Sequence, residues 1–500
     1  MSKQVRVRFA PSPTGALHIG GVRTALFNYL FAKKNNGVFY LRIEDTDQNR
    51  FVEGAEQYIL DALDWLGIAP SETIGKNEKF GPYRQSERKE LYKQYADLLI
   101  ESGNAYYAFD KAEALDSLRK QQESEGKTFI YNHTIREKLD TSLIISKEET
   151  TKRIESGEEF VIRFKTPTDE TLHLTDIIRG DIKFETGLLD DKVLFKSDGM
   201  PTYHLANIVD DHLMETSHVI RGEEWLPSMP LHVMLYRAFG WEAPEFAHLP
   251  LIMKPIGNGK LSKRDGDKLG FPVFPLQWQT ESGLTKGYKE SGFFPEAVIN
   301  FLALLGWNDG TEQEIFSLDE LVEKFDLSRI HKSGAKFDPE KNKWFNHQYL
   351  QKQSDESLAD SYRLILSDKG ISTALDVTKI VSLIKERTNF VSEFWEMSDY
   401  FFQSPKLYDE KALKNWKDET PDLMKRLIDV LQNINDFTSL NVENIVKNWI
   451  TENEIGMGKI MQPLRLSLVG ALKGAHLFDI VDVIGKDETV SRIEKAIEKL

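Results

Sequence analysis

The sequence predicts an α/β domain of the Rossmann-like type that is interrupted by an inserted α+β domain and followed by an all-α region. Three observations support this fold class. A strand pattern changes into a helix pattern near the N-terminus, and the same alternation returns later in the chain. Between the two α/β parts, residues from about 108 to 158 are charged and contain few large apolar side chains. From residue 351 to 500 the sequence has helical periods and almost no strand signal.

The first element is a junction between a strand and a helix. Apolar and charged residues alternate over residues 5–9, which is the period of a strand. Apolar residues over 22–30 follow the i, i+3, i+4, i+7 spacing of an amphipathic helix that ends at Asn35–Gly37. Residues 38–43 form the next expected strand. The loop in Arg8–Gly21 therefore precedes a helix N-terminus, where free N–H groups favour anionic ligands.

The remaining elements follow the same patterns of periodicity and turn residues. Further strands are expected at residues 160–165, 171–186, 193–195 and 218–220, of which the first two are assigned to the insertion. Further helices are expected around Ile59–Leu66, at 86–102, at 228–239 and over most of 295–350. Lys254–Gly270 is expected to be a polar loop in which glycines flank a basic cluster.

Composition limits the possible functions. With 500 residues, 40% of them hydrophobic, the chain can form several domains with proper cores. Its formal charge of −15 argues against a protein that coats nucleic acid, although a local basic groove is compatible with it. The absence of cysteine excludes disulfides and thiolate metal sites. No targeting segment is evident, and the most apolar helical run, Ala297–Leu305, is too short to span a membrane. We expect a soluble cytoplasmic monomer that does not enter membranes.

The first candidate site is His18-Ile19-Gly20-Gly21. Two small residues at a helix N-terminus allow a phosphate to approach the backbone, and a neighbouring histidine can donate to a phosphate oxygen. The alternative is a structural glycine turn with a surface histidine. A bare motif of this kind favours that alternative, but the preceding strand and the stiff Pro11–Gly15 leader favour the phosphate site.

The second candidate site is the basic cluster Lys260–Arg264, which places three cations within five residues. Such a cluster suits a clamp on a triphosphate, and its alternative is a solvated basic loop. The clamp is favoured because the cluster is paired with the first motif within one α/β framework.

Together the two motifs resemble the two signatures of class I aminoacyl-tRNA synthetases. The wider sequence resembles the bacterial-type glutamyl-tRNA synthetases of the glutamate/glutamine subgroup. The stretches that carry this resemblance are Arg8–Gly15 (RFAPSPTG), Leu41–Asp47 (LRIEDTD), Gly81–Ser86 (GPYRQS), Lys196–Asn207 (KSDGMPTYHLAN), Val219–Trp225 (VIRGEEW) and Met461–Arg465 (MQPLR).

The resemblance implies a division of the chain into domains. The expected parts are a split catalytic domain at 1–82 and 203–254, an inserted acceptor-end-binding domain at 83–202, a stem-contact domain with the basic loop at 255–349, and a helical anticodon-binding region at 350–500 with a break near 405–421. The partners so implied are tRNA(Glu), L-glutamate and ATP.

The implied reaction joins glutamate to AMP and then transfers it to the 3′-terminal adenosine of the tRNA. The substrate carboxylate is already a nucleophile at neutral pH, so positioning and cations near the leaving pyrophosphate matter most. By resemblance the catalytic residues are His18, Lys260 and Lys263. The expected ATP contacts are His18, Gly20, Gly21, Glu224, Ile252, Lys260, Ser262, Lys263 and Arg264, with Mg²⁺ bridging the phosphates. Leu261 stands where many class I enzymes have methionine.

Glutamate has two carboxylates, and guanidinium groups can bind them bidentately. By resemblance Arg8 with Tyr203 would bind the side-chain carboxylate, and Arg221 with Asn207 the α-carboxylate. Ser12 and Glu44 would face the α-ammonium group, and Ala10 would offer a backbone contact. Each residue has a structural alternative, for example helix capping by Glu44, but the matching positions as a set favour the glutamate site.

Three further expectations concern metal, anticodon and specificity. Some family members bind zinc near Ala105–Asp110, and with no cysteine here we expect no zinc and no metal-binding residues. By resemblance Arg387 contacts the anticodon, and the aromatic segment Phe390–Phe402 either stacks on bases or fills a core. The sequence leaves open whether tRNA(Gln) is also charged. A truncated relative that glutamylates an anticodon base is disfavoured by the helical C-terminal half, and a catalytically inactive tRNA-binding relative by the intact motifs.

Overall fold

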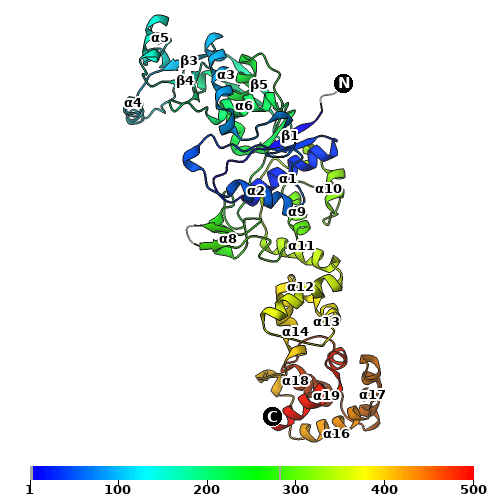
Figure 1. The fold of residues 1–500 in the computed structure, drawn as a ribbon. Helices are drawn as coiled ribbons and strands as arrows, with labels where there is room; N and C mark the ends of the chain where they lie inside the picture. Colours follow the sequence, from blue (N-terminus) through cyan, green and yellow to red (C-terminus); the bar gives the residue numbers. More distant parts are fainter. Residues whose placement is uncertain (1–3, 281–282) are drawn as a thin grey trace. The chain divides into compact units, whose positions relative to one another are not determined.

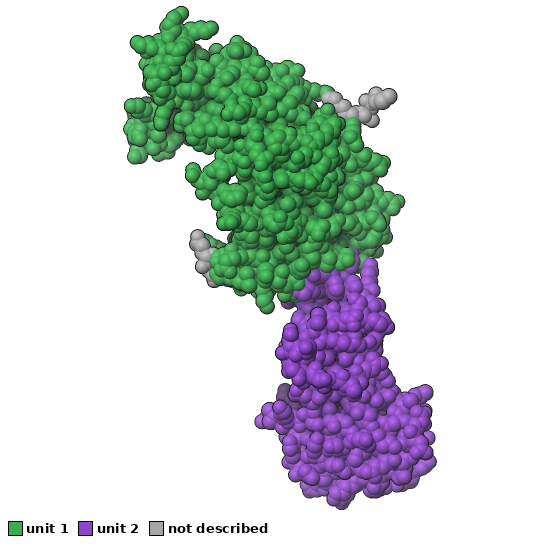
Figure 2. All heavy atoms as spheres, in the orientation of Figure 1, with its two compact units in different colours: residues 1–291, 295–339 green, residues 292–294, 340–500 purple. Residues whose placement is uncertain are grey.

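The structure, a computed structural model, describes residues 4–280 and 283–500. The chain forms two compact units (Figures 1 and 2). Unit 1 contains residues 1–291 and 295–339, and unit 2 contains residues 292–294 and 340–500. The predicted helical region was expected to begin at residue 350, so the second unit begins ten residues earlier than expected, within the helix α11 (Pro339–Lys352).

Unit 1 begins with the predicted strand–helix–strand unit. The strands β1 (Arg6–Phe9) and β2 (Val38–Leu41) pair in parallel, and α1 (Ile19–Lys34) connects them (Figure 1). The helix ends at Asn35, as predicted from the turn sequence. Gly37 is required here, because a Cβ atom at this position would lie 2.3 Å from the Val5 carbonyl oxygen. The local sequence pattern therefore forms the α/β element that it predicts.

The larger sheet of unit 1 has the strand order β6–β5–β9–β8. Its strands are β5 (Thr171–Asp176), β6 (Gly180–Glu185), β8 (His218–Gly222) and β9 (Glu245–Leu249). β8 and β9 are parallel, β5 and β6 form an antiparallel hairpin, and β5 joins β9 at Asp176 and Phe246. β1 lies beside β8, because the Ser217 N–H donates to the Arg6 carbonyl oxygen over 2.9 Å.

This topology corrects one expectation. The segment 171–186 was assigned to the inserted domain at 83–202, but its hairpin is hydrogen-bonded into the same sheet as β8 and β9. The physical reason is the buried carboxylate of Asp176 at the end of β5. It accepts a hydrogen bond from the His248 backbone N–H and lies 2.7 Å from the His248 ring. A contact across 72 residues ties the hairpin to the sheet.

Three of the helices beside these sheets match predicted periodic segments, namely α2 (Ala55–Trp65), α3 (Lys89–Glu101) and α7 (Met229–Ala238). No helix was predicted for the fourth, α6 (Tyr203–Leu213). The apolar faces of α3, α6 and α7 and the strands of the large sheet share one core that includes Tyr92, Leu205, Leu235 and Phe246. This core fixes α6 against β8, which brings residues from both elements to one cavity.

The insertion is more structured than its composition predicts. It contains a three-stranded sheet of β3 (Ala105–Ala108), β4 (Val161–Phe164) and β7 (Val193–Phe195), and the helices α4 (Ala112–Ser124) and α5 (Lys147–Glu155). We expected residues 108–158 to have no core, which is wrong. Tyr131 packs on Tyr106 and Ala108 of β3, with Phe129 and Leu139 beside them. A few aromatic residues thus form a small core that average composition conceals.

A buried carboxylate holds this small core together. Asp191 is fully buried and accepts hydrogen bonds from the Tyr106 hydroxyl, the Thr166 backbone N–H and the Arg136 guanidinium. We expect Asp191→Ala to lower the free energy of unfolding by about 3–5 kcal/mol, since it leaves Arg136 buried without its partner. Urea denaturation checks this, with Asp116→Ala in the surface pair with Arg119 as a neutral control. Equal stability of both variants would contradict the prediction.

The rest of unit 1 follows the large sheet. Its elements are β10 (Ile252–Met253), α8 (Lys263–Leu269), β11 (Trp278–Thr280), β12 (Gly283–Thr285), α9 (Pro295–Leu304), α10 (Leu318–Lys324) and β13 (Ala335–Lys336). The expectation that Lys254–Gly270 is entirely a loop is therefore wrong. Ser262 caps α8 through Asp265, a capping box that the sequence contains and that we missed.

The described part of unit 2 contains helices and no strands, as predicted. After α11 its helices are α12 (Asp355–Asp368), α13 (Val377–Ile384), α14 (Phe394–Phe402), α15 (Glu410–Leu413), α16 (Thr420–Gln432), α17 (Ser439–Glu452), α18 (Gly458–Val469) and α19 (Leu477–Lys499). Phe394 and Phe401 are buried in the core of this unit, so the aromatic segment fills a core at these two positions. Among the residues described, no helix is long and apolar enough to cross a membrane.

Candidate active site

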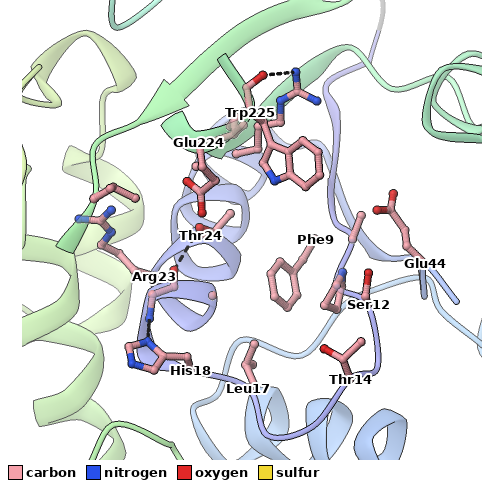
Figure 3. Close-up of a pocket in the computed structure, with 18 of the residues that line it drawn as sticks. Phe9, Ser12, Thr14, Leu17, His18, Arg23, Thr24, Glu44, Glu224 and Trp225 are labelled. Carbon is pink, nitrogen blue, oxygen red and sulfur yellow. Dashed lines mark hydrogen bonds between the residues drawn. The ribbon is translucent and has the colours of Figure 1, made fainter. Parts of the chain in front are cut away.

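A cavity of about 640 Å³ lies in unit 1, where the carboxyl ends of β1 and β8 meet the N-terminus of α1. Most of the site residues predicted in this unit line the cavity. They are Arg8, Ala10, Ser12, His18, Gly20, Gly21, Glu44, Tyr203, Arg221, Glu224, Ile252 and Lys260. Figure 3 shows Ser12 and Glu44 on one side of the cavity and His18 and Arg23 on the other. The residues outside this lining are Asn207, Ser262, Lys263 and Arg264.

Arg8 is already paired in this structure. Its Nε and Nη2 donate to the two carboxylate oxygens of Asp211 over 3.0 and 3.2 Å. Asp211 also accepts from Arg42 over 2.8 Å. Burial alone would raise the pKa of the Asp211 carboxyl, but the two guanidinium groups lower it below its usual value. Asp211 therefore compensates most of the Arg8 charge and orients the free edge of its guanidinium.

Glu44 and Asn207 form a contact beside this cluster. Oε1 of Glu44 accepts from Arg42 over 2.9 Å and from the Asn207 amide over 3.2 Å. Burial raises the pKa of the Glu44 carboxyl, with Arg42 and Arg8 acting in the opposite direction. Oδ1 of Asn207 is buried without a hydrogen-bond partner. The Asn207 amide thus holds one oxygen of Glu44, and Asn207 keeps a free acceptor of its own.

Arg221 has a different environment from that of Arg8. It is 5% exposed, and all its hydrogen-bond partners are neutral. They are Nε2 of His248 at 3.1 Å, the Tyr203 hydroxyl at 3.1 Å, Nδ1 of His232 at 3.2 Å and the Trp225 carbonyl oxygen at 3.3 Å. Within the described residues no carboxylate forms an ion pair with Arg221. A buried cation without a counter-ion is costly, so the cavity is prepared for an anion.

The hydrogen bonds of Tyr203 and Asn207 differ from the pairing that the sequence analysis expected. We expected Tyr203 to act with Arg8 and Asn207 to act with Arg221. In the structure the Tyr203 hydroxyl accepts from Arg221, and the Asn207 amide donates to Glu44. Because the Tyr203 oxygen accepts from Arg221, its own hydrogen is free to donate into the cavity.

The buried charges between β1, α6 and β8 do not cancel. The cations are Arg8, Arg42, Arg88 and Arg221, and the carboxylates in contact with them are Asp210, Asp211 and Glu44. Four positive groups and three negative groups leave one net positive charge. This part of the cavity is therefore complementary to a ligand with one net negative charge.

His18 has a defined tautomer at the N-terminus of α1. Its Nδ1 accepts from the Gly20 N–H over 3.2 Å, so the ring caps the helix and carries its proton on Nε2 (Figure 3). Burial, together with the nearby Lys260 charge, lowers the pKa of His18 to about 4. Nε2 is buried and has no hydrogen-bond partner. The ring is thus a neutral donor, as a phosphate ligand requires.

The two glycines after His18 have different roles. A Cβ atom on Gly21 would lie 2.6 Å from Leu17, whereas one on Gly20 would meet only His18 Nδ1, at an ordinary 3.5 Å. Gly21 is therefore needed for packing, and Gly20 leaves space within the cavity. This separates a structural glycine from one that can face a ligand.

We expect Gly20→Ala to raise KM for ATP about tenfold or more, since a methyl group there would occupy the space at the helix N-terminus. Stability should be unchanged or slightly higher, because alanine is favoured over glycine in helices. Steady-state kinetics and thermal unfolding measure the two effects. Gly458→Ala at the start of α18, where a Cβ atom meets nothing within 4 Å, is the matched control. An unchanged KM for ATP in the Gly20 variant would refute the assignment.

The basic cluster is divided by the start of α8. Lys260 lines the cavity and pairs with Glu224, with the Lys260 Nζ 3.0 Å from Glu224 Oε1. Lys263 and Arg264 belong to the first turn of α8, and the Ser262 hydroxyl pairs with Asp265. In this structure only Lys260 of the expected clamp lies against the cavity.

Several lining residues were missed by the sequence analysis. The main one is Trp225, whose ring lies 4.2 Å from that of Tyr203 and whose carbonyl oxygen binds Arg221. It ends the VIRGEEW stretch that carries the resemblance, so the motif itself contained the signal. Arg23 was also missed, and its guanidinium donates to the carbonyl oxygens of Pro250 and Leu305. Its position in the middle of α1 gave no local signal.

Two other predictions concern metals and unit 2. Among the described residues there is no group of three or more histidine, aspartate or glutamate side chains that could hold a metal ion. Arg387 lies in unit 2, where its Nη1 donates to the Gly474 carbonyl oxygen over 2.7 Å. Arg465 donates to the carbonyl oxygens of Lys473 and Ala475 in the same loop.

Comparison with known families defines the class of protein. The family "tRNA synthetases class I (E and Q), catalytic domain" matches residues 4–344, and the family "Anticodon binding domain" matches residues 347–497. The fold and the site are thus those of a class I aminoacyl-tRNA synthetase with a helical anticodon-binding domain.

Full-length relatives narrow this class. The glutamate–tRNA ligase of Flavobacterium johnsoniae is 79% identical, covering 100% of both chains, and that of Christiangramia forsetii is 60% identical with the same coverage. A crystal structure of a glutamate tRNA ligase from Elizabethkingia meningosepticum in complex with its amino acid has a TM-score of 0.97, is 51% identical and covers 100% of both chains. The chain belongs to the family of glutamate–tRNA ligases.

Proposed function

We propose that this chain activates L-glutamate with ATP and transfers the glutamyl group to the 3′-terminal adenosine of tRNA(Glu). The observation that carries the proposal is the buried Arg221, whose partners are all neutral and which lines the same cavity as the free Nε2 of His18. Arg221 needs an anionic partner, and the Nε2–H of His18 needs a hydrogen-bond acceptor. A glutamate carboxylate and an ATP phosphate satisfy these two needs in one cavity.

In the first step the α-carboxylate attacks the α-phosphorus of ATP, which releases pyrophosphate. The carboxylate needs no general base, so the protein contributes positioning and charge stabilisation. His18 donates Nε2–H to a phosphate oxygen, and Lys260 supplies a positive charge at the cavity edge. Ser262, Lys263 and Arg264 lie outside the cavity lining, at the start of α8, and follow Lys260 closely in the chain, so we assign them to the phosphates as well. Mg²⁺, arriving with ATP, would neutralise further phosphate charge.

Charge balance accounts for the choice of amino acid. Glutamate has a net charge of −1, which matches the one net positive charge between β1, α6 and β8. We assign the side-chain carboxylate to Arg8, the α-carboxylate to Arg221 and Tyr203, and the α-ammonium group to the free oxygen of Glu44 and to Ser12. Glutamine is neutral and would leave the cation without a partner, at a cost of roughly 2–5 kcal/mol.

Unit 2 supplies the contact with the anticodon. Arg387 and Arg465 both donate hydrogen bonds to carbonyl oxygens of the loop that contains Lys473. Their positive charges are thus available to phosphates or bases of a tRNA loop. We assign Arg387 to the anticodon on this basis.

Aminoacylation of purified tRNA(Glu) with ATP and labelled glutamate tests the proposal. We expect charged tRNA that requires all three substrates, and the family resemblance implies that tRNA is also needed for activation. The same assay with glutamine should give no product. An enzyme preparation that is folded, binds tRNA and forms no glutamyl-tRNA would overturn the proposal.

A further inference from the structure

Arg221 is held by a continuous chain of side chains that begins and ends away from the cavity. On one side, the Arg221 Nε donates to His248 Nε2 over 3.1 Å, and His248 Nδ1 lies 2.7 Å from the Asp176 carboxylate. On the other side, the Arg221 Nη1 lies 3.2 Å from His232 Nδ1, and His232 Nε2 lies 3.1 Å from His204 Nδ1. Five elements contribute to this chain, namely β5, β8, β9, α6 and α7.

The contacts determine the tautomers of the two histidines next to Arg221. An arginine can only donate hydrogen bonds, so His248 Nε2 and His232 Nδ1 must both be acceptors. His248 then carries its proton on Nδ1 and donates it to Asp176, and His232 carries its proton on Nε2 and donates it to His204. Both rings are fully buried and neutral in this arrangement. Burial is the main cause that lowers the pKa of each ring.

We propose that His232 and His248 are positioning residues that fix the Arg221 guanidinium through neutral ring nitrogens and so leave its full charge for the substrate carboxylate. Acceptors of this size could equally be carboxylates, as Asp211 is for Arg8. A carboxylate in place of His232 would cancel the net positive charge of the cavity. Asp176, the carboxylate in this series of contacts, instead binds His248, so that the His248 ring lies between it and Arg221.

This inference rests on the proposed function, in which Arg221 binds a carboxylate of glutamate. It extends that function by naming two residues that the cavity lining does not contain. It also gives a role to the β5–β6 hairpin, because Asp176 orients His248 from the end of β5. The hairpin thereby influences the amino-acid site without touching a substrate.

A matched pair of variants at position 232 tests the role of neutrality. Asparagine and aspartate have nearly the same shape, and both place an oxygen close to the position of His232 Nδ1. We expect His232→Asn to raise KM for glutamate at most about threefold and His232→Asp to raise it at least about tenfold, while KM for ATP stays the same. The aspartate variant should be at least as resistant to heat as the asparagine variant, because it gains a buried partner for Arg221. Aminoacylation kinetics and thermal unfolding measure these quantities.

A merely structural role predicts a different result, namely that KM for glutamate follows stability. Equal KM values for the two position-232 variants would overturn the inference. Arg221→Gln separates the inference from the proposed function. If that variant binds glutamate normally, the assignment of Arg221 fails. If it loses glutamate binding and His232→Asp does not, only the inference fails.

His248 provides a second test if the aspartate variant does not fold. His248→Gln can place a neutral acceptor near the position of Nε2, whereas His248→Leu has none. We expect only the leucine variant to raise KM for glutamate by about fivefold or more, with titration calorimetry of glutamate binding as the direct readout. Equal affinities of these two variants would also overturn the inference.

Discussion

Arg221→Gln is expected to raise KM for glutamate by at least about 30-fold with little loss of stability. The change removes the buried cation that pairs with a substrate carboxylate, and this loss costs roughly 2–5 kcal/mol of binding free energy. Because about 1.4 kcal/mol corresponds to a factor of ten in affinity, the lower limit gives the 30-fold increase. The free energy of unfolding should change little for a separate reason. In the free enzyme Arg221 is a buried charge without an acidic partner among the described residues, so its removal also removes a desolvation cost. Aminoacylation kinetics with varied glutamate, together with thermal unfolding, measure both effects.

Arg88→Gln is the matched control for this prediction. Arg88 is also buried, but its Nε donates to the Asp210 carboxylate over 2.7 Å, and it does not line the cavity. Its removal leaves Asp210 with one cation fewer, so the free energy of unfolding should fall by about 3–5 kcal/mol. KM for glutamate should rise far less than in Arg221→Gln, because Arg88 lies outside the cavity lining and cannot contact a substrate carboxylate there. Arg221→Gln should thus lose glutamate binding and keep its stability, whereas Arg88→Gln should lose stability and keep most of its glutamate binding. If each variant lost both glutamate binding and stability, the charge assignment would be contradicted.

Arg8 and Arg221 illustrate what the sequence can predict and what it cannot. Local periodicity is sufficient for α1, whose hydrogen bonds join residues close together in the chain, and alternation is sufficient to identify β1 as a strand, although not to identify the strands that it pairs with. It also places His18 and Gly20 at a helix N-terminus. The difference between Arg8 and Arg221 has another origin, since Asp211 lies 203 residues from Arg8. No local pattern indicates which arginine carries a counter-ion.

The same physical reason explains two of the errors in the predicted fold. The hairpin of β5 and β6 alternates like any exposed hairpin, and its place in the large sheet depends on the distant contact between Asp176 and His248. The core under Tyr131 consists of a few aromatic residues within a polar stretch. The missed helix α8 is a different case, because its capping box was present in the local sequence.

His18→Asn is expected to lower kcat roughly 100- to 1000-fold, which is the usual effect of removing one donor to developing negative charge. The side-chain oxygen of asparagine can replace His18 Nδ1 as the acceptor of the Gly20 N–H, and asparagine is a good helix cap. It has no group that reaches the position of Nε2. The variant therefore separates the two functions of the ring, and its melting temperature should match that of the wild type.

Two more variants at this position complete the argument. His18→Ala removes both the cap and the donor, so it should lose the same activity and about 1 kcal/mol of stability in addition. His18→Gln can extend an amide donor toward the position of Nε2 and should recover part of kcat. Because the pKa of His18 is about 4 in the ligand-free protein, the wild-type ring is a neutral donor from pH 5 upward when ATP binds. The kcat/KM for ATP should therefore show no step near pH 6.5 that is missing in His18→Asn. A wild-type kcat in the asparagine variant would show that Nε2 does not act on the phosphates, and the free donor in the cavity would then need another ligand.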